Sequence, residues 1–193
     1  MRDDLIHQIE LYQPFNAQEE ADREVILSAL KNTGDIFFRT NRTAHMTASA
    51  WVVNPDGGKI LLAYHNIYDS WAWLGGHADG EEDLLSVAIR EVKEESGISH
   101  VIPLQESVFS LEVLTVDGHV KKGSYVSSHL HLNLTYLLCA DEREQPVSKP
   151  DENRAVAWFA REKAIEQSSE PWFRERIYSK LNQKLEEYLR TQK

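Results

Sequence analysis

The sequence has only one cysteine, Cys139, among 193 residues, and a single thiol cannot form an internal disulfide. It has no apolar run long enough to span a bilayer, and the segment 1–4 lacks the apolar region of a secretory signal peptide. Basic residues are in the minority, with 21 Lys and Arg against 31 Asp and Glu, which argues against non-specific binding of nucleic acid. These absences favour a cytoplasmic protein with no nucleic-acid partner and no membrane partner.

The chain does contain enough apolar material for one core. Hydrophobic residues make up 41% of the sequence and charged residues 27%, and this length fits a single domain over 1–193. An apolar stripe predicts a helical extension over 1–34, and Pro171 begins a predicted C-terminal helix over 171–193. Cys139 lies in an apolar run and is expected to be a buried, unreactive thiol. The helices at both ends also offer surfaces through which a homodimer could form.

Alternation of apolar and polar residues predicts several strands between the end helices. A turn sequence at 54–58 joins the first two into a hairpin. The predicted strands cover 45–53, 59–65, 108–116, 128–140 and 155–160. We also expect Ile36–Phe38 to form an edge strand and 161–167 to form a short helix. Helices that pack on a sheet in this order predict an α/β or α+β fold.

The most informative stretch runs from Gly76 to Ile98, where a glycine-rich loop precedes an acidic amphipathic helix. Its apolar residues recur with the spacing of one helical face, and they are Leu85, Ala88, Ile89 and Val92. Gly97 suits the left-handed position just after a helix. Glu94 and Glu95 follow Glu91 by three and four residues, so the three carboxylates can converge on one point. Hard cations such as Mg²⁺ take oxygen ligands of this kind.

Two interpretations of these glutamates are open at this point. A solvated acidic helix face is one, because repulsion between like charges at this spacing costs only about 0.2–0.5 kcal/mol per pair. A Mg²⁺ site is the other. Glu82, near the start of the helix, could pair with Arg90, and the ion pair would tie the loop to the helix and hold Arg90 away from the metal. We assign Glu82 and Arg90 this supporting role.

The complete pattern resembles the Nudix box, Gly-x5-Glu-x7-Arg-Glu-aliphatic-x-Glu-Glu-x-Gly-aliphatic. Every defined position is filled, by Gly76, Glu82, Arg90, Glu91, Val92, Glu94, Glu95, Gly97 and Ile98. At about one in fifteen per fixed position, a chance match is on the order of one in a million. The resemblance implies a Nudix fold, in which α-helices sandwich a mixed β-sheet. It also implies a hydrolase that uses Mg²⁺ or Mn²⁺ to cut a pyrophosphate bond in a nucleoside diphosphate linked to another moiety.

The resemblance also implies roles for individual residues. The metal ligands would be the box glutamates together with the backbone carbonyl of Gly75, so the set is Glu91, Glu94, Glu95 and Gly75. The general base is left open between Glu94 and a further carboxylate in the loop 141–152, where Glu144 and Glu152 are the candidates. Many relatives have a proline where this chain has Leu74, a difference expected to alter loop stiffness and not the chemistry.

Aromatic and histidine residues are candidates for substrate binding. Trp71 and Trp73 precede the box and could stack on a base, or could simply pack in the fold. His77, in the box loop, could contact a phosphate, or could be a solvated or structural residue. One face of the strand predicted over 128–140 is polar enough to line a substrate cavity, and its members are His129, His131, Asn133 and Thr135. With a third ligand, the two histidines of this face could also bind a transition metal.

Two other functions fit parts of the sequence. A catalytically silent Nudix-type module could bind a nucleotide or metabolite, although the intact glutamates argue against it. A relative similar to isopentenyl-diphosphate isomerase would use a cysteine and a glutamate in catalysis, and Cys139, in an apolar run, is a poor candidate for that cysteine. The box itself is compatible with ADP-ribose, nucleotide sugars, dinucleoside polyphosphates and nucleoside triphosphates, so the substrate stays open.

Overall fold

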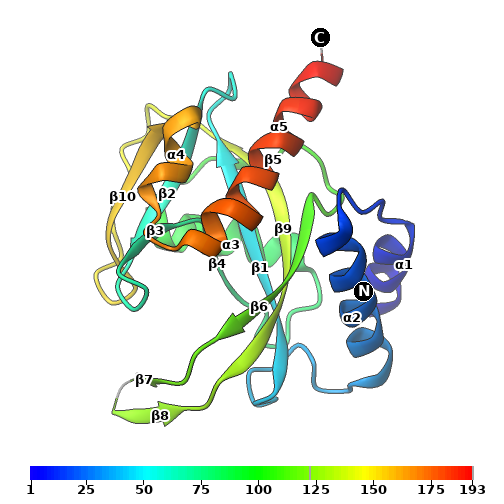
Figure 1. The fold of residues 1–193 in the computed structure, drawn as a ribbon. Helices are drawn as coiled ribbons and strands as arrows, with labels where there is room; N and C mark the ends of the chain where they lie inside the picture. Colours follow the sequence, from blue (N-terminus) through cyan, green and yellow to red (C-terminus); the bar gives the residue numbers. More distant parts are fainter. Residues whose placement is uncertain (122, 193) are drawn as a thin grey trace. The chain divides into compact units, whose positions relative to one another are not determined.

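The computed structural model describes residues 1–121 and 123–192, and Lys122 and Lys193 lie outside this description. Figure 1 draws its helices and strands. The chain divides into two compact units. The first unit comprises Met1–Ser49, Gly75–Ala88 and Glu106–Tyr136, and the second comprises Ala50–Leu74, Ile89–Gln105 and Leu137–Lys193.

Helices and strands alternate along the chain in the predicted manner. The helices are α1 (Arg2–Leu11), α2 (Ala17–Asn32), α3 (Leu84–Ser96), α4 (Arg161–Gln167), the π-helical segment η1 (Phe173–Tyr178) and α5 (Ser179–Thr191). The strands are β1 (Ala44–Val53), β2 (Lys59–His65), β3 (Ser70–Ala72), β4 (Leu74–His77), β5 (Val101–Pro103), β6 (Ser110–Val116), β7 (His119–Lys121), β8 (Ser124–Val126), β9 (His129–Ala140) and β10 (Asn153–Ala160). The predicted α+β class with a mixed sheet is confirmed. None of the described helices is long and apolar enough to cross a membrane.

The first unit contains the pairing of β6 with β9. The two strands run antiparallel, from Ser110 opposite Thr135 to Val116 opposite His129. β4 pairs with β1, while α2 packs against β6 and against α1. The segment Ile36–Phe38 forms turns and not the predicted edge strand, because the Phe38 N–H donates to the Asp35 carbonyl at 2.9 Å.

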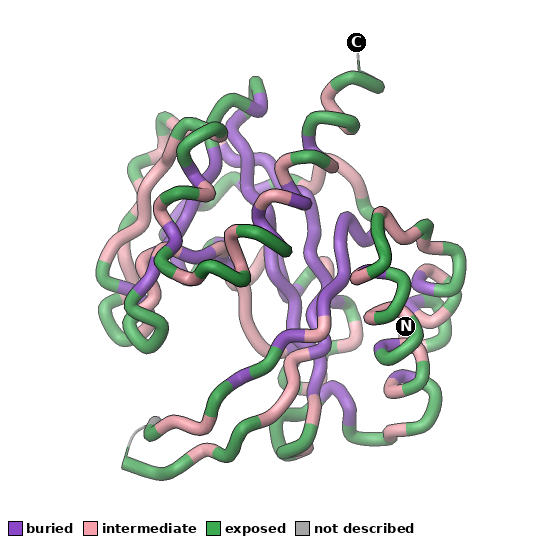
Figure 2. Tube along the Cα trace, viewed as in Figure 1, coloured by how far each residue is buried: buried purple, intermediate pink, exposed green. Residues whose placement is uncertain are grey.

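The second unit is built around β2, which lies between β10 and the end of β1. The predicted hairpin is confirmed, since Val52 pairs with Leu61 in antiparallel register. β10 pairs along the other edge of β2, and α4 packs against both strands. Trp51 is fully buried and stacks on Tyr178 at 5.4 Å between ring centroids. The strands carry most of the buried residues, and β1 is buried from its second residue to its last (Figure 2).

Helix α3 has the predicted end but a different buried face. Its start is capped by Asp83, whose side chain accepts from the Ser86 N–H at 3.2 Å. Gly97 follows the helix with φ of 69°, the left-handed conformation that glycine adopts without strain. The buried residues are Leu84, Val87, Ala88 and Val92, whereas Leu85 and Ile89, predicted to face the core, are only half-buried. The prediction of the apolar face was therefore wrong for two of its four residues and right for Ala88 and Val92.

Two further expectations are confirmed in the second unit. Cys139 is a free and buried cysteine. The predicted C-terminal helix forms as η1 and α5, in which Ile177, Leu181 and Leu185 are buried while Tyr188 and Leu189 are half-buried. The prediction of one domain over 1–193 stays a prediction.

Candidate functional site

The last turn of α3, in the second unit, carries the three box glutamates. Glu95 is buried, with 7% of its surface exposed. Glu91 is half-buried and accepts from Arg90 Nη2 at 2.9 Å. Glu94 is the most exposed of the three and accepts from Lys149 Nζ at 3.3 Å. Burial raises the pKa of Glu91, while the hydrogen bond from Arg90 works against that rise.

The three carboxylates do not converge in this structure. Among the described residues, they do not form a group whose ligand atoms all lie within 4.8 Å of one another. Their convergence on one metal ion stays a prediction. Cations of the chain neutralise two of them, since Arg90 pairs with Glu91 at 2.9 Å and with Glu94 at 3.9 Å, and Lys149 pairs with Glu94 at 3.3 Å. The donors still fit Mg²⁺ chemically, since all three offer carboxylate oxygens from one helix turn.

The end of the loop 141–152 lies against this helix turn. Lys149 Nζ binds both Glu94, at 3.3 Å, and Glu152, at 3.1 Å. The side-chain amide of Asn153 donates to the backbone carbonyl of Glu95 at 3.0 Å. The charge of Glu152 contributes to the raised pKa of Glu91. Of the two loop carboxylates that the sequence suggested, Glu152 is thus the one beside the box glutamates.

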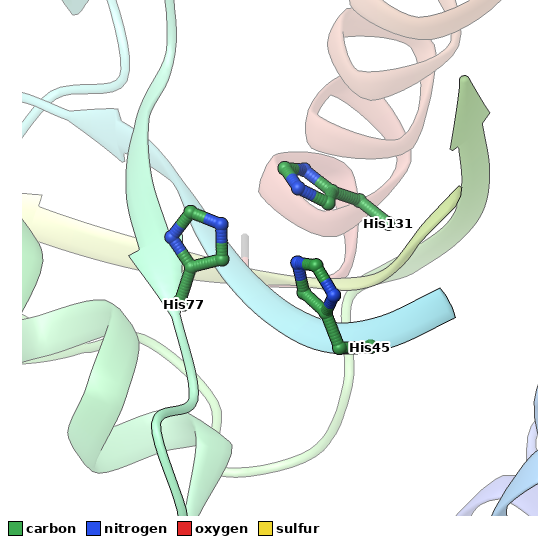
Figure 3. A group of neighbouring side chains, drawn as sticks. All are labelled: His45, His77 and His131. Atoms are coloured by element: carbon green, nitrogen blue, oxygen red, sulfur yellow. The ribbon is translucent and has the colours of Figure 1, made fainter. Parts of the chain in front are cut away.

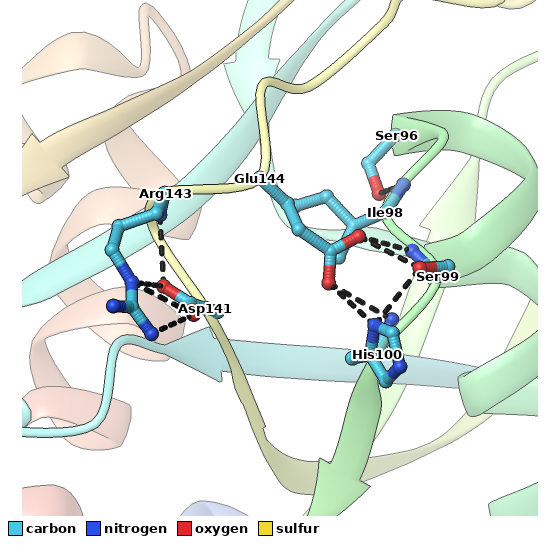
Figure 4. Close-up of polar contacts among 7 residues, drawn as sticks. All are labelled: Ser96, Ile98, Ser99, His100, Asp141, Arg143 and Glu144. Carbon is cyan, nitrogen blue, oxygen red and sulfur yellow. Dashed lines mark hydrogen bonds and ion pairs between the residues drawn. The ribbon is translucent and has the colours of Figure 1, made fainter.

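Glu144 has a different role, shown in Figure 4. Its carboxylate accepts from the Ser99 N–H at 2.9 Å, from the Ser99 hydroxyl at 2.8 Å and from the His100 N–H at 3.2 Å. These hydrogen bonds, those from Ser99 above all, lower the pKa of Glu144 to about 2. A carboxylate with so low a pKa is a weak base at neutral pH. The structure thus places Glu144 as a cap on the segment after α3 and argues against its predicted role as the base.

Gly75 lies in the first unit, where β4 passes very close to β1. A side-chain carbon at this position would stand 2.5 Å from the Ala48 carbonyl oxygen and 2.6 Å from the Ser49 Cα. Only glycine fits such an approach of two backbones. This packing explains why the chain has glycine here, and the role of the Gly75 carbonyl as a metal ligand stays a prediction.

Glu82 and Arg90 both make contacts that suit structural support. In the first unit, the Glu82 carboxylate accepts from the backbone N–H of Arg2 at 2.9 Å, which ties the start of α1 to the box loop. In the second unit, Arg90 lies against Glu91. Arg90 therefore contacts one of the predicted metal ligands, while its ion pair with Glu82 stays a prediction.

The two tryptophans before α3 are half-buried in aromatic clusters of the second unit. Trp71 makes an edge contact with Phe159 at 4.8 Å between ring centroids, and Trp73 makes one with Tyr178 at 5.7 Å. These contacts support the packing interpretation. Stacking on a substrate ring stays a prediction for both residues.

The polar face of β9 divides into two parts. Asn133 and Thr135 are buried in the first unit, and both donate to the Glu112 carboxylate at 2.9 Å. They hold a buried carboxylate inside the fold, so they do not line the predicted cavity. His129 and His131, at the other end of the strand, remain partly exposed.

Two histidines that the sequence did not connect with this face join it in the first unit. They are His45, on β1, and His77, on β4 (Figure 3). The centroid of each ring lies 5.0 Å from the ring centroid of His131. We call His45, His77, His129 and His131 the histidine cluster. The alternation along β9 predicted that His129 and His131 share a face. The addition of His45 and His77 depends on which strands pair, and the sequence alone does not show this.

Comparison with known proteins agrees with the fold. A family model described as the NUDIX domain matches residues 43–181, and no curated protein matches. A C. elegans Ap4A hydrolase binary complex is similar at a TM-score of 0.55 and 22% identity, over 76% of this chain and 98% of that one. A NUDIX-family hydrolase from Clostridium perfringens is similar at a TM-score of 0.53 and 20% identity, over 75% of this chain and 97% of that one. A UDP-X diphosphatase is similar at a TM-score of 0.50 and 15% identity, over 100% of this chain and 93% of that one.

Proposed function

The chain belongs to the NUDIX domain family, and on that premise we propose that it is a Mg²⁺-dependent hydrolase, with Mn²⁺ as an alternative ion. Its substrate would be a nucleoside diphosphate linked to another moiety, cut at the pyrophosphate bond. The observation that carries this proposal is the last turn of α3. That turn presents Glu91, Glu94 and Glu95 together, with Lys149 and Glu152 beside them.

Each residue of this turn has a part that its surroundings support. Glu91 and Glu95 would be the principal metal ligands, because both are shielded from solvent and a cation would offset the cost of burying their charge. Arg90 orients Glu91 through its hydrogen bond. When bound, the divalent cation supplies charge neutralisation at the phosphates and makes a bound water more acidic.

We propose that a carboxylate beside the metal ligands accepts the proton of the attacking water. Glu152 is favoured over Glu144, because Glu152 shares Lys149 with Glu94 whereas hydrogen bonds hold the pKa of Glu144 at about 2. Glu94 is the second candidate, since it is the most exposed of the box glutamates.

The test is hydrolysis of a panel of substrates with Mg²⁺ and with Mn²⁺. The panel contains ADP-ribose, UDP-sugars, Ap4A and nucleoside triphosphates, which cover the substrates named for the similar structures as well as those that the box allows. Wild type is compared with Glu95→Gln, and Glu187→Gln, an exposed change on α5, is the matched control. We expect Glu95→Gln to lower kcat/KM by at least about 100-fold, as loss of a metal ligand should, while the control stays at the wild-type level.

Near-normal turnover by a folded Glu95→Gln protein would contradict the metal assignment. If no compound is cleaved but one of them raises the Tm of the wild type, the silent binding module becomes the better hypothesis. The intact set of glutamates argues against that outcome.

An isomerase-like activity is disfavoured by Cys139. Its thiol is buried, and burial raises its pKa, so the reactive thiolate is scarce at neutral pH. We expect Cys139→Ala to keep full hydrolytic activity. Loss of activity without loss of folding would show that Cys139 takes part in the chemistry, as the isomerase-like alternative requires.

A further inference from the structure

The histidine cluster gathers half of the chain's eight histidines in the first unit. One nitrogen from each of His45, His77 and His131 can be chosen so that all three atoms lie within 4.8 Å of one another. Figure 3 shows the three rings facing one another from three different strands. Among the residues that the structure describes, no other set of three or more potential ligand side chains is so close.

His45 has a ring nitrogen that the fold does not use. Its Nδ1 faces the Asn41 carbonyl at 3.0 Å, and a carbonyl can only accept, so Nδ1 carries the proton. Its Nε2 is buried and has no hydrogen-bond partner within the described part of the chain. Only 3% of the His45 surface is exposed. A buried, unpaired nitrogen lone pair costs free energy unless a donor or a cation faces it.

His129 holds the neighbouring ligand in place. Its Nδ1 faces the Ser127 carbonyl at 2.8 Å, which leaves Nε2 of a neutral ring as an acceptor. That Nε2 lies 3.2 Å from Nε2 of His131. A backbone carbonyl on the second ring nitrogen, as at His45, is a usual outer-shell partner of a metal-ligating histidine. For His131, Nε2 of His129 takes this place.

Two simpler explanations account for less. Stacking alone would explain the ring contacts, but it leaves the buried Nε2 of His45 unpaired. An anion site would need positively charged rings, whereas burial lowers the pKa of His45 and so disfavours the charged form of that ring. Neutral imidazoles are ligands for transition metals, and Mg²⁺ prefers oxygen.

We propose that His45, His77 and His131 form a binding site for a divalent transition-metal ion of the Zn²⁺ class, with His129 as a positioning residue. Three protein nitrogens leave the fourth tetrahedral position open for water or for a ligand group. The site uses none of the box glutamates, so it would exist whether or not the proposed hydrolase activity is correct.

The experiment measures Zn²⁺ binding to the full chain by competition with a chromophoric chelator. Excess Mg²⁺ is present so that carboxylates do not take up Zn²⁺. We expect one Zn²⁺ per chain in the wild type and in the matched control His7→Gln, an exposed histidine of α1. His77→Gln and His131→Gln should each weaken binding by at least about 100-fold, and His129→Gln by about 10-fold.

Circular dichroism shows whether each variant is folded, and His77→Gln and His131→Gln are preferred to a change at the fully buried His45. Co²⁺ gives a second measurement, because a tetrahedral Co²⁺ complex has a visible absorption band that should be lost with either ligand. A wild type that binds no Zn²⁺ would overturn the proposal. So would a folded His131→Gln protein with wild-type affinity, or an equal loss in His7→Gln.

Discussion

Lys149 Nζ lies 3.3 Å from the Glu94 carboxylate and 3.1 Å from that of Glu152. One lysine thus connects a box glutamate with the loop carboxylate that we favour as the base. If Glu94 binds the proposed divalent cation, we expect the ammonium group of Lys149 to compete with that cation for the same carboxylate. On this hypothesis Lys149 competes with the metal and stabilises the protein without metal.

Replacing Lys149 by methionine tests this dual role. We expect the Mg²⁺ concentration for half-maximal activity to fall by up to about fivefold, because a partly exposed ion pair contributes at most about 1 kcal/mol. In the absence of metal, the Tm should fall slightly, since the carboxylates lose a neutralising charge. Lys163→Met, at an exposed position of α4, is the control. A higher Mg²⁺ requirement in Lys149→Met would show that the lysine assists metal binding.

Glu144→Gln should reduce stability without changing the chemical step. The carboxylate has a folded-state pKa of about 2 against an ordinary value of 4.5, so it favours the folded state above pH 4.5. This contribution is lost as the pH falls from 4.5 towards 2. The Tm difference between wild type and Glu144→Gln should therefore be clear at pH 7 and shrink across that interval. A large fall in kcat at pH 7 would restore Glu144 as the base.

Local patterns gave the hairpin, the box helix and its glycine end, because each depends on residues adjacent in sequence. Local patterns could not show which of Glu144 and Glu152 lies beside the box glutamates. Both are acidic residues of one loop, and only the fold brings Ser99 to one and Lys149 to the other. Hydrogen bonds between segments that are far apart in the sequence produce no characteristic residue spacing, so the sequence alone cannot predict them.

The buried face of α3 and the histidine cluster illustrate two other limits. Leu84 and Leu85 are equally apolar, so periodicity cannot decide which of them the neighbouring strands cover. His129 and His131 were visible as alternate residues of a strand. The position of His45 opposite them depends on strand pairing, which the sequence does not specify at that distance.

The buried polar group around Asn133 predicts a large stability effect. The Asn133 amide donates to Glu112 at 2.9 Å, and its oxygen accepts from Thr47 at 3.0 Å and from Ser49 at 2.9 Å. Asn133→Ala would leave a fully buried carboxylate with fewer donors. We expect a loss of about 2–4 kcal/mol in the free energy of unfolding, measured by urea denaturation. Thr115→Ala, an exposed change on β6, should cost less than about 0.5 kcal/mol.

Gly75→Ala separates packing from metal binding at the start of the box. The added carbon would stand 2.5 Å from the Ala48 carbonyl oxygen, so β4 must move away from β1. Overpacking of this kind costs about 1–3 kcal/mol, and the contact here is with backbone, which cannot rotate aside. Gly34→Ala is the matched control, because nothing lies within 4 Å of the carbon that it adds. Urea denaturation without metal should show the loss for Gly75→Ala alone. The opposite result would be two variants that are equally stable without metal, with Gly75→Ala needing more Mg²⁺ for activity. In that case the glycine is required for metal binding by its carbonyl and not for the packing of the strands.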